Sequence, residues 1–407
     1  MSKVEMMSAK DQKKGTLAPP LRFPEFREAE EWEKKEISDL LTIGNGKDYK
    51  HLSTGTIPVY GTGGYMLSVN DYLYDGESVC IGRKGTIDNP FFVSGKFWTV
   101  DTLFYTHKFN NTTPKFIYFC FQRIKWSDYN AASGVPSLSK STIERIKIAI
   151  PAFKEQKKIA DFFSSLDERI AAESDKLDAL KAHKNGLLKQ LFPAEGEILP
   201  ALRFPEFRDA GEWEEANLID LVHFYDGFAF KSTEFVKSKQ NATQVVRITD
   251  INNKNLNTDK IYIPNDFLKH GNFDKYRAVN GDLLLSLTGA AGFNFFFWDG
   301  GDAVLNQRTM KIAPKNESWD ALVRLIEPLA HEKINARGEG QNNNLSKEFL
   351  NCITIIIPAS EEQHRIADCL SSLDELITAQ TQKIDLLKDH KKGLMQQLFP
   401  ALDEVRA

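Results

Sequence analysis

Three short stretches of the chain carry side chains suited to reading the edges of nucleic-acid bases. GRKG (82–85) places Arg83 and Lys84 between glycines, where backbone and side chains can approach a duplex closely. LNQRT (305–309) and GEGQNNNLS (338–346) offer amides and an arginine. Arginine and lysine pair with guanine edges, and asparagine and glutamine pair with adenine edges. Each loop alone is equally typical of a hydrated surface turn, but their comparable places in two halves of the chain favour base recognition.

The sequence contains no convincing active site. The sequence lacks the phosphate-binding GxxxxGK[ST] pattern, GxGxxG, HExxH and GxSxG. DNPFF (88–92) resembles the [DN]PP[FY] loop of adenine methyltransferases but has one proline where two are required, so we interpret it as an ordinary turn. His183 and His390 each stand alone beside lysines, which favours a solvated or interface histidine. We therefore predict a non-catalytic chain with no metal or cofactor site.

Length and composition indicate a globular protein of several domains. The chain has 407 residues, which suggests two or three domains. Its start, Met1–Lys14, is polar and lysine-containing, so we expect residues 1–20 to form a flexible tail rather than a signal peptide. No stretch approaches the ~18 apolar residues of a membrane span. The cysteines form no CxxC pair, which predicts a reducing, cytoplasmic location and no structural zinc; they are Cys80, Cys120, Cys352 and Cys369.

The overall charge leaves the nature of the partner open. The net charge of −4 by itself argues against a nucleic-acid partner. The distribution is uneven, however, because residues 37–150 hold 12 Lys and Arg against 9 Asp and Glu. Such asymmetry matters more than the sum when only part of the surface meets the partner.

The chain is an internal duplication. LRFPEFR occurs at 21–27 and again at 202–208, an offset of 181, and a longer segment beginning IPA occurs at 150–194 and 357–401, an offset of 207. Fixed offsets of this kind mark a repeated structural unit. The larger second offset predicts about 26 extra residues in the second half, which we place in Val245–Asn265. Each half is thus a variable module followed by a nearly constant segment.

The constant segments predict two long helices that pack on each other. Each begins near a proline and runs without glycine or proline until Gly186 or Gly393. Apolar residues recur every three and four positions, and each series is interrupted by polar residues at the same two places: Glu173 and Lys184, or Gln380 and Lys391. This spacing is typical of a coiled coil. The predicted seam and partner interface comprises Ile159, Phe163, Leu166, Ile170, Leu177, Leu180, Leu187, Ile366, Leu370, Leu373, Ile377, Ile384, Leu387 and Leu394. A helical hairpin that merely cores a larger domain is the alternative.

The variable modules read as mixed α and β. In the first module, 76–87 and 97–105 are expected as strands and 114–124 as a helix; in the second, 281–292 and 306–314 are expected as strands and 321–329 as a helix. Both modules close with a polar loop, a short helix led by Ser139 or Ser346, and an apolar strand. We predict an α+β protein with two mixed modules, two long antiparallel helices and an internal pseudo-twofold repeat. The expected boundaries are 21–150 and 202–357 for the modules, and 151–195 and 358–400 for the helices.

The duplicated segment resembles the specificity subunit of type I restriction-modification enzymes. Its pattern is IPAxxEQxxIADxxSSLDExI followed by GLxxQLFP, and the similarity covers nearly the whole chain after residue 20. In that family the modules are target recognition domains, and each reads one half of a split, asymmetric DNA sequence. The helices set the spacing and dock two modification (methyltransferase) subunits, and restriction (motor-nuclease) subunits join for cleavage. S-adenosylmethionine, ATP and Mg²⁺ are then expected on the partners rather than on this chain.

We accordingly assign candidate DNA-binding residues in both modules. They are Lys47, Arg83, Lys84, Thr86, Ser133 and Ser137 in the first, and Lys231, Arg247, Thr288, Gln307, Arg308, Gln341, Asn342, Asn343 and Asn344 in the second. Two other functions remain open on the sequence: a stand-alone DNA-binding regulator with two reading heads, and an adaptor whose coil scaffolds proteins without binding nucleic acid.

Overall fold

A computed structural model describes residues 17–252, 259–288, 293–316, 320–336 and 345–401. The chain divides into two compact units. The first unit comprises Met1–Lys176 and Gln380–Ala407, and the second comprises Leu177–Ala379. Each unit contains one mixed module and parts of two long helices, α4 (Phe153–Leu191) and α10 (Ser360–Gln397). The predicted α+β architecture is confirmed.

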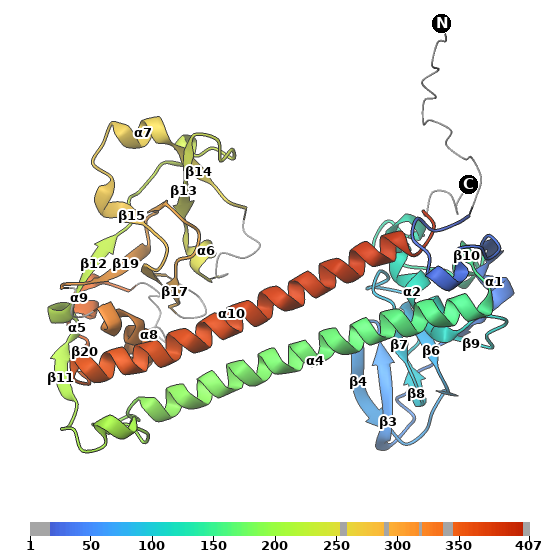
Figure 1. The fold of residues 1–407 in the computed structure, drawn as a ribbon, viewed down its shortest axis with the longest axis horizontal. Helices are drawn as coiled ribbons and strands as arrows, with labels where there is room; N and C mark the ends of the chain where they lie inside the picture. Colours follow the sequence, from blue (N-terminus) through green and yellow to red (C-terminus); the bar gives the residue numbers. More distant parts are fainter. Residues whose placement is uncertain (1–16, 253–258, 289–292, 317–319, 337–344, 402–407) are drawn as a thin grey trace, which may run out of the picture. The chain divides into compact units, whose positions relative to one another are not determined.

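The first module is built from three small sheets and short helices (Figure 1). Its elements are η1 (Pro24–Phe26), β1 (Glu33–Glu36), α1 (Ile37–Leu40), β2 (Thr42–Asn45), β3 (Thr54–Gly61), β4 (Gly64–Val69), β5 (Tyr74–Asp75), β6 (Ser78–Gly82), β7 (Phe91–Val93), β8 (Lys96–Thr99), β9 (Leu103–His107), α2 (Pro114–Arg123), η2 (Trp126–Tyr129), α3 (Lys140–Glu144) and β10 (Lys147–Ile150). The strand orders are β2-β9-β6-β7, β4-β3-β8-β5 and β1-β10.

The second module repeats this topology. Its elements are η3 (Pro205–Phe207), β11 (Glu214–Asn217), α5 (Leu218–Leu221), β12 (Val222–Asp226), η4 (Ser232–Glu234), β13 (Ala242–Val246), α6 (Ile248–Asn252), β14 (Tyr262–Pro264), α7 (Asn265–Lys269), η5 (Asp274–Tyr276), β15 (Arg277–Ala278), β16 (Leu283–Ser286), β17 (Phe295–Phe297), β18 (Ala303–Leu305), β19 (Thr309–Pro314), α8 (Asp320–Ala336), α9 (Lys347–Asn351) and β20 (Thr354–Ile357). The strand orders β12-β19-β16-β17, β14-β13-β18-β15 and β11-β20 match those of the first module one for one.

Several sequence expectations need adjustment. The strands expected over 76–87 and 281–292 are shorter, since β6 ends at Gly82 and β16 ends at Ser286. The stretch 97–105 is not continuous strand: β8 and β9 are separated by a turn at residues 100–102. The extra residues of the second module extend beyond the predicted 245–265. They include α6, which lies in the predicted range, but also α7 and η5 after Pro264; β14 itself is the counterpart of β4. The short helices α3 and α9 do begin after Ser139 and Ser346, whose hydroxyls accept hydrogen bonds from the third backbone amide beyond them.

Each long helix ends in a hydrophobic core. Leu398 and Phe399, just past α10, are buried in the core of the first unit, where the Phe399 ring lies 5.7 Å from that of Trp32. Phe192, just past α4, is buried in the core of the second unit, with its ring 6.3 Å from that of Trp213. The repeated LFP sequence is therefore a core segment in both units, since burying a large aromatic ring is among the strongest packing contributions.

The repeated LRFPEFR motif fastens the beginning of each module to the start of a long helix. The guanidinium of Arg22 donates two hydrogen bonds to Glu155 on α4, at 2.8 and 2.6 Å, and Glu155 is 1% exposed. Arg203 makes the same pair of bonds to Glu362 on α10, at 2.8 and 2.6 Å. These hydrogen bonds raise the pKa of both arginines. A planar guanidinium paired in this bidentate way fixes geometry as well as charge.

The polar interruptions of the two seams are where α4 and α10 contact each other. In the first unit, Gln380 donates to the carbonyl and the carboxylate of Glu173, at 2.8 and 2.7 Å, and Lys391 pairs with Asp167 at 2.6 Å. In the second unit, Lys184 pairs with Asp374 at 2.6 Å. The residue numbers of the partners on α10 decrease as those on α4 increase. The two helices are therefore antiparallel, as predicted.

The contact between Glu173 and Gln380 joins equivalent positions of the two repeats. The bond from Gln380 and the ammonium of Lys383 lower the pKa of the Glu173 carboxyl. All residues of the predicted apolar seam are buried or half-buried. Buried are Ile159, Phe163, Leu177, Ile366, Leu370, Leu373 and Ile384; half-buried are Leu166, Ile170, Leu180, Leu187, Ile377, Leu387 and Leu394.

Among the described helices, none has both the length and the apolar character needed to cross a membrane.

We predict that Arg22→Ala destabilises the first unit by about 3 kcal/mol, because it leaves the carboxylate of Glu155 buried without a partner. Arg27→Ala, an exposed position in the same heptapeptide, is the matched control and should change stability by less than about 0.5 kcal/mol. Chemical denaturation followed by tryptophan fluorescence measures both. Equal effects of the two substitutions would show that the ion pair does not hold this segment in place.

Candidate nucleic-acid interface

The GRKG loop of the first module is held against the turn between β8 and β9. The backbone amides of Arg83 and Lys84 both donate to the carbonyl of Thr102, at 2.8 and 3.3 Å. A Cβ at Gly82 would lie 2.0 Å from the carbonyl oxygen of Thr86, so only glycine allows the loop to close this tightly. The loop is therefore fixed by its backbone, which leaves the side chains of Arg83, Lys84 and Thr86 exposed.

A second loop, residues 130–138, joins the first. The amide of Gly85 donates to the carbonyl of Pro136 at 2.9 Å, and the amide of Leu138 donates to the carbonyl of Arg83 at 2.9 Å. Within the loop, the side-chain oxygen of Asn130 accepts from the amide of Ser137 at 2.9 Å. This arrangement places Ser137 beside Lys84, with which it forms a backbone bridge. Ser133 lies exposed in the same loop.

A third segment, around Lys47, approaches the same turn from the end of β2. The amide of Lys47 donates to the carbonyl of Thr99 at 2.8 Å, and the Lys47 carbonyl accepts from the indole of Trp98 at 2.9 Å. A Cβ at Gly46 would lie 1.9 Å from the carbonyl oxygen of Val100, so the two backbones pass in direct contact. The structure thus gathers the predicted residues of the first module around one turn.

The side chains of the exposed cations on this surface make few contacts with the rest of the protein. The Arg83 guanidinium lies 3.5 Å from the carbonyl of Asp101 and 5.9 Å from the ring centroid of Phe104. The side chains of Lys47 and Lys84 are exposed. Fixed backbone with free cationic side chains is the combination needed to contact phosphates and base edges.

The second module repeats the main backbone bonds of this arrangement. The amide of Leu287 donates to the carbonyl of Arg308 at 2.8 Å, and the amide of Leu345 donates to the carbonyl of Leu287 at 2.9 Å. A Cβ at Gly227 would lie 1.9 Å from the carbonyl oxygen of Asn306. Leu287 thus takes the place of Arg83, and Arg308 that of Thr102. We call these shared backbone bonds around the two turns, 100–102 and 306–308, the reading framework.

The turn of the second module presents different side chains on that framework. Gln307 and Arg308 are both exposed, and they stand where the first module has Asp101 and Thr102. Arg308 has a φ of +65°, a left-handed conformation that is uncommon for a residue with a side chain. Such conformations persist where the surrounding structure imposes them, and they recur at functional sites.

The remaining predicted residues of the second module divide into four groups. Thr288 is half-buried directly after Leu287, in the place of Lys84. Lys231 is exposed at the start of η4, beyond the reading framework, and its amide donates to the carboxylate of Glu234 at 2.8 Å. The guanidinium of Arg247 is held by Asp250 at 3.3 Å and by the carbonyl of Asp259 at 2.6 Å. Gln341, Asn342, Asn343 and Asn344 lie outside the described residues.

Comparison with known proteins accounts for this duplicated arrangement. The sequence profile of the type I restriction modification DNA specificity domain matches residues 29–182 and 210–389. The chain belongs to this family. It is 24% identical to the type I restriction enzyme MjaVIII specificity subunit of Methanocaldococcus jannaschii, over 92% of this chain and 93% of that protein. Its fold is similar to the crystal structure of a type I restriction-modification system S subunit from M. genitalium, with a TM-score of 0.64, 14% identity and coverage of 95% and 100%.

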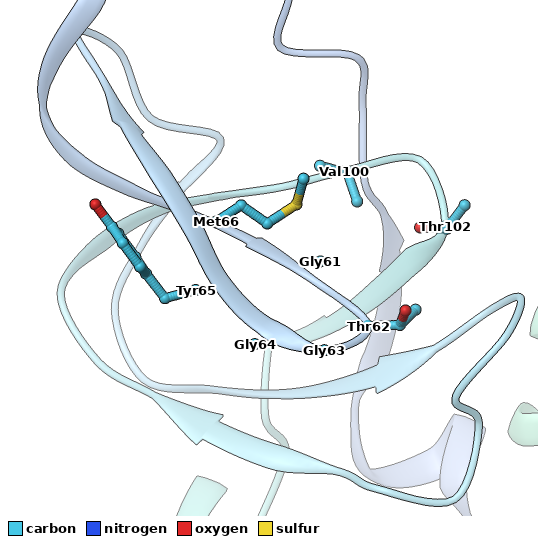
Figure 2. A pocket seen from close by; sticks show the side chains of 8 residues that line it. All are labelled: Gly61, Thr62, Gly63, Gly64, Tyr65, Met66, Val100 and Thr102. Carbon is cyan, nitrogen blue, oxygen red and sulfur yellow. The ribbon is translucent and has the colours of Figure 1, made fainter. Parts of the chain in front are cut away.

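Each specificity domain therefore includes one reading framework, and sequence reasoning missed part of it. Asp101 and Thr102 form the turn itself but were read as the middle of a strand. Aligning VDTL (100–103) with NQRT (306–309) through the flanking strands would have identified them, because the second stretch was already recognised as a candidate loop. A hollow beside this turn, lined by the β3–β4 hairpin, was also missed (Figure 2).

The buried thiols of the first specificity domain are core residues. Burial raises the pKa of Cys120 to about 12 and also raises the pKa of Cys80. Both thiols therefore stay protonated at neutral pH. Because the thiolate and not the thiol is the nucleophile, neither cysteine is reactive. Over the part of the chain that the structure describes, no three His, Cys, Asp or Glu side chains cluster in a way that could hold a metal ion.

We predict that Gly46→Ala disrupts the first reading framework while Gly134→Ala does not. The added methyl of Gly46→Ala would lie 1.9 Å from the oxygen of Val100, whereas the methyl of Gly134→Ala meets open space. Forcing the backbones apart should cost about 2 kcal/mol and expose the GRKG loop to protease. Thermal denaturation and limited proteolysis of the two variants measure this. Indistinguishable behaviour of both variants would mean that the close approach at Gly46 does not organise the turn.

Proposed function

We propose that the chain is the DNA-recognition subunit of a type I restriction-modification enzyme, with each module reading one half of an asymmetric bipartite target. The observation that carries this is the reading framework, which occurs twice with the same backbone bonds and different outward side chains. A shared frame gives both modules the same way of approaching DNA, while unlike side chains give them unlike base preferences. The specificity subunit is not itself an enzyme, in keeping with its family.

The chemistry of methylation and cleavage then belongs to partner subunits. We propose two modification subunits docked on the α4–α10 pair, and restriction subunits in the complete enzyme. S-adenosylmethionine, ATP and Mg²⁺ would be bound by those partners. Because the target is DNA, the assembly works in the cytoplasm. The MjaVIII relative is named as a specificity subunit of a type I restriction enzyme, which supports a multi-subunit assembly.

We further propose that the recognition modules span 21–150 and 202–357, with spacer helices over 151–195 and 358–400. Antiparallel pairing of the first and last strands of each module supports these boundaries. Glu33 of β1 pairs with Ile150 of β10, and Glu214 of β11 pairs with Ile357 of β20. Each module is thereby closed by its own ends before a long helix begins.

The assignment of reading residues predicts effects confined to one half-site. Arg83→Ala and Lys84→Ala should relax recognition of one half, and Gln307→Ala and Arg308→Ala should relax the other, each lost base contact costing about 1–3 kcal/mol. The readout is sequencing of methylated adenines in cells that express each variant with its modification subunit. Lys125→Ala, which removes an exposed cation outside the reading framework, is the control and should leave the target unchanged.

Two results would overturn this assignment. Equal losses at both half-sites would make these residues phosphate contacts, which carry no sequence information. Salt-dependent, sequence-specific DNA binding by a chain that captures no methyltransferase would favour a stand-alone regulator instead.

The spacer role predicts that longer helices lengthen the unread gap. Inserting one heptad after Ile170 on α4 and one after Lys383 on α10 places both insertions on the same side of the Glu173–Gln380 contact and preserves the apolar seam. Seven helical residues add about 10 Å, which corresponds to roughly three base pairs at ~3.4 Å each. Methylated-site sequencing should show the same two half-sites separated by a longer gap.

The matched control inserts seven residues at Glu195-Gly196, beyond the end of α4, and should leave the gap unchanged. An active double-heptad variant with an unaltered gap would exclude the helices as the ruler.

A further inference from the structure

A hollow of about 380 Å³ lies beside the reading framework of the first module (Figure 2). One wall is the β3–β4 hairpin and the other is the turn between β8 and β9. The side chains that line it are Thr62, Tyr65, Met66, Val100 and Thr102. None of them is among the DNA-binding residues assigned above.

Glycines at the hairpin tip shape this hollow. Gly61 pairs with Gly64 across the hairpin, and Gly64 has a φ of +103°, which a residue with a side chain adopts only under strain. A Cβ at Gly61 would lie 2.7 Å from the sulfur of Met66, so the absence of a side chain lets Met66 lie over the strand. A Cβ at Gly63 would meet nothing within 4 Å. The tip is therefore open to a ligand that approaches from outside.

The hollow adjoins the cationic loop. The carbonyl of Thr102, one of its walls, accepts the amides of Arg83 and Lys84. On the other wall, the hydroxyl of Thr62 would be 3.8 Å from a Cβ at Gly85 in the same GRKG loop. The amide of Val100 donates to the carbonyl of Tyr60 at 3.0 Å, which ties hairpin and turn together. A duplex held by the two cations would bring base edges to this opening.

The lining matches the major-groove edge of thymine. Thymine presents the O4 acceptor next to the C5 methyl group, and proteins recognise that methyl by apolar contact. Met66 and Val100 supply apolar atoms, since the sulfur of Met66 and a methyl of Val100 lie 2.7 and 3.7 Å from a Cβ at Gly61. Thr62 and Thr102 supply hydroxyl groups that can donate to O4.

We propose that this hollow, here called the thymine subsite, receives the C5 methyl of a T·A pair in the half-site read by the first module. The proposal rests on the proposed function and adds a specific base to it. It assigns Met66 and Val100 as specificity-determining residues by contact with the methyl group, and Thr62 and Thr102 by hydrogen bonding to O4.

The second module has a different structure at the corresponding place. There the amide of Asn306 donates to the carbonyl of Val246 at 2.9 Å, the counterpart of the bond from Val100 to Tyr60. The residue after Val246 is Arg247, which takes the place of Gly61 and pairs with the buried carboxylate of Asp250. An ion pair thus stands where the first module has a glycine and a thioether, so the thymine subsite belongs to one half-site only.

Replacing thymine by uracil tests the subsite, because uracil lacks only the methyl group. The full chain, assembled with its modification subunit, is titrated against duplexes that carry the target identified by methylated-site sequencing. Each thymine of the first module's half-site is replaced by uracil in turn. One replacement should weaken binding about fourfold, the equilibrium equivalent of burying one methyl group. Met66→Ala and Val100→Ala should bind the thymine and uracil duplexes at that position equally.

Control variants and control duplexes show whether the loss of discrimination comes from the hollow. Met66→Leu, which keeps a side chain of similar volume, should retain the discrimination, and so should Val279→Ala at an exposed apolar position of the second module. Uracil in the other half-site should affect wild-type and Met66→Ala assemblies alike. Unchanged circular dichroism spectra show that the variants fold.

Sequence-specific binding without any thymine-to-uracil effect, or a first half-site that contains no T·A pair, overturns the thymine subsite and leaves the proposed function intact. Loss of discrimination in Val279→Ala as well would also overturn it, because the effect would not come from the hollow. Absence of sequence-specific binding by the wild-type assembly is a different outcome, since it overturns the proposed function itself.

Discussion

The structure depends on a backbone carbonyl that accepts hydrogen bonds at a turn between two strands. In the first module this is the carbonyl of Thr102, which fixes the amides of Arg83 and Lys84; in the second it is that of Arg308, which fixes the amide of Leu287. Because these bonds use only the backbone, the same frame can carry different side chains at the outward positions. Recognition can therefore change while the frame stays the same. That separation of frame from side chain would let one duplicated unit serve the two different half-sites proposed above.

The duplication also fixes where each module is attached. Arg22 and Arg203 bind the buried carboxylates of Glu155 and Glu362 with matching distances, so the same clamp operates at the start of both long helices. The helices contact each other through the polar interruptions of their seams. A polar contact at a seam position specifies register in coiled coils at some cost in stability. Register is what a spacer must preserve, and a purely apolar seam would define it less sharply.

Most of the fold could be predicted from the periodicity and the repetition in the sequence. The matched seam interruptions at Glu173 and Gln380 predicted that the helices pack together, and the structure pairs those two residues directly. Prediction from the local sequence pattern was wrong where the strand boundaries depend on pairing between distant segments. The stretch 97–105 is apolar enough to read as one strand, yet β8 pairs with β3 and β9 pairs with β2 and β6, so the chain must turn between them.

The loops of the candidate site could be predicted from the sequence, but the partners of its side chains and the neighbouring hollow could not. Glycines around Arg83 and Lys84 mark the loop in the sequence, because close backbone approach requires them. The sequence around Arg247 does not predict that the backbone carbonyl of Asp259, twelve positions later, accepts a hydrogen bond from its guanidinium. The thymine subsite is formed by segments about forty residues apart, the hairpin around Met66 and the turn around Thr102, and only strand pairing brings them together.

The most direct test of a shared frame with exchangeable reading surfaces is the target of a chain whose two halves are identical. Residues 202–400 are replaced by a second copy of 21–193 in which Glu173→Gln retains the carboxylate–amide contact between the helices. Methylated adenines are then sequenced in cells that also express the modification subunit. With a shared frame, the target should be symmetric, and the first module's half-site should occur in it twice in opposite orientations. A target that keeps two different half-sites would contradict a shared frame.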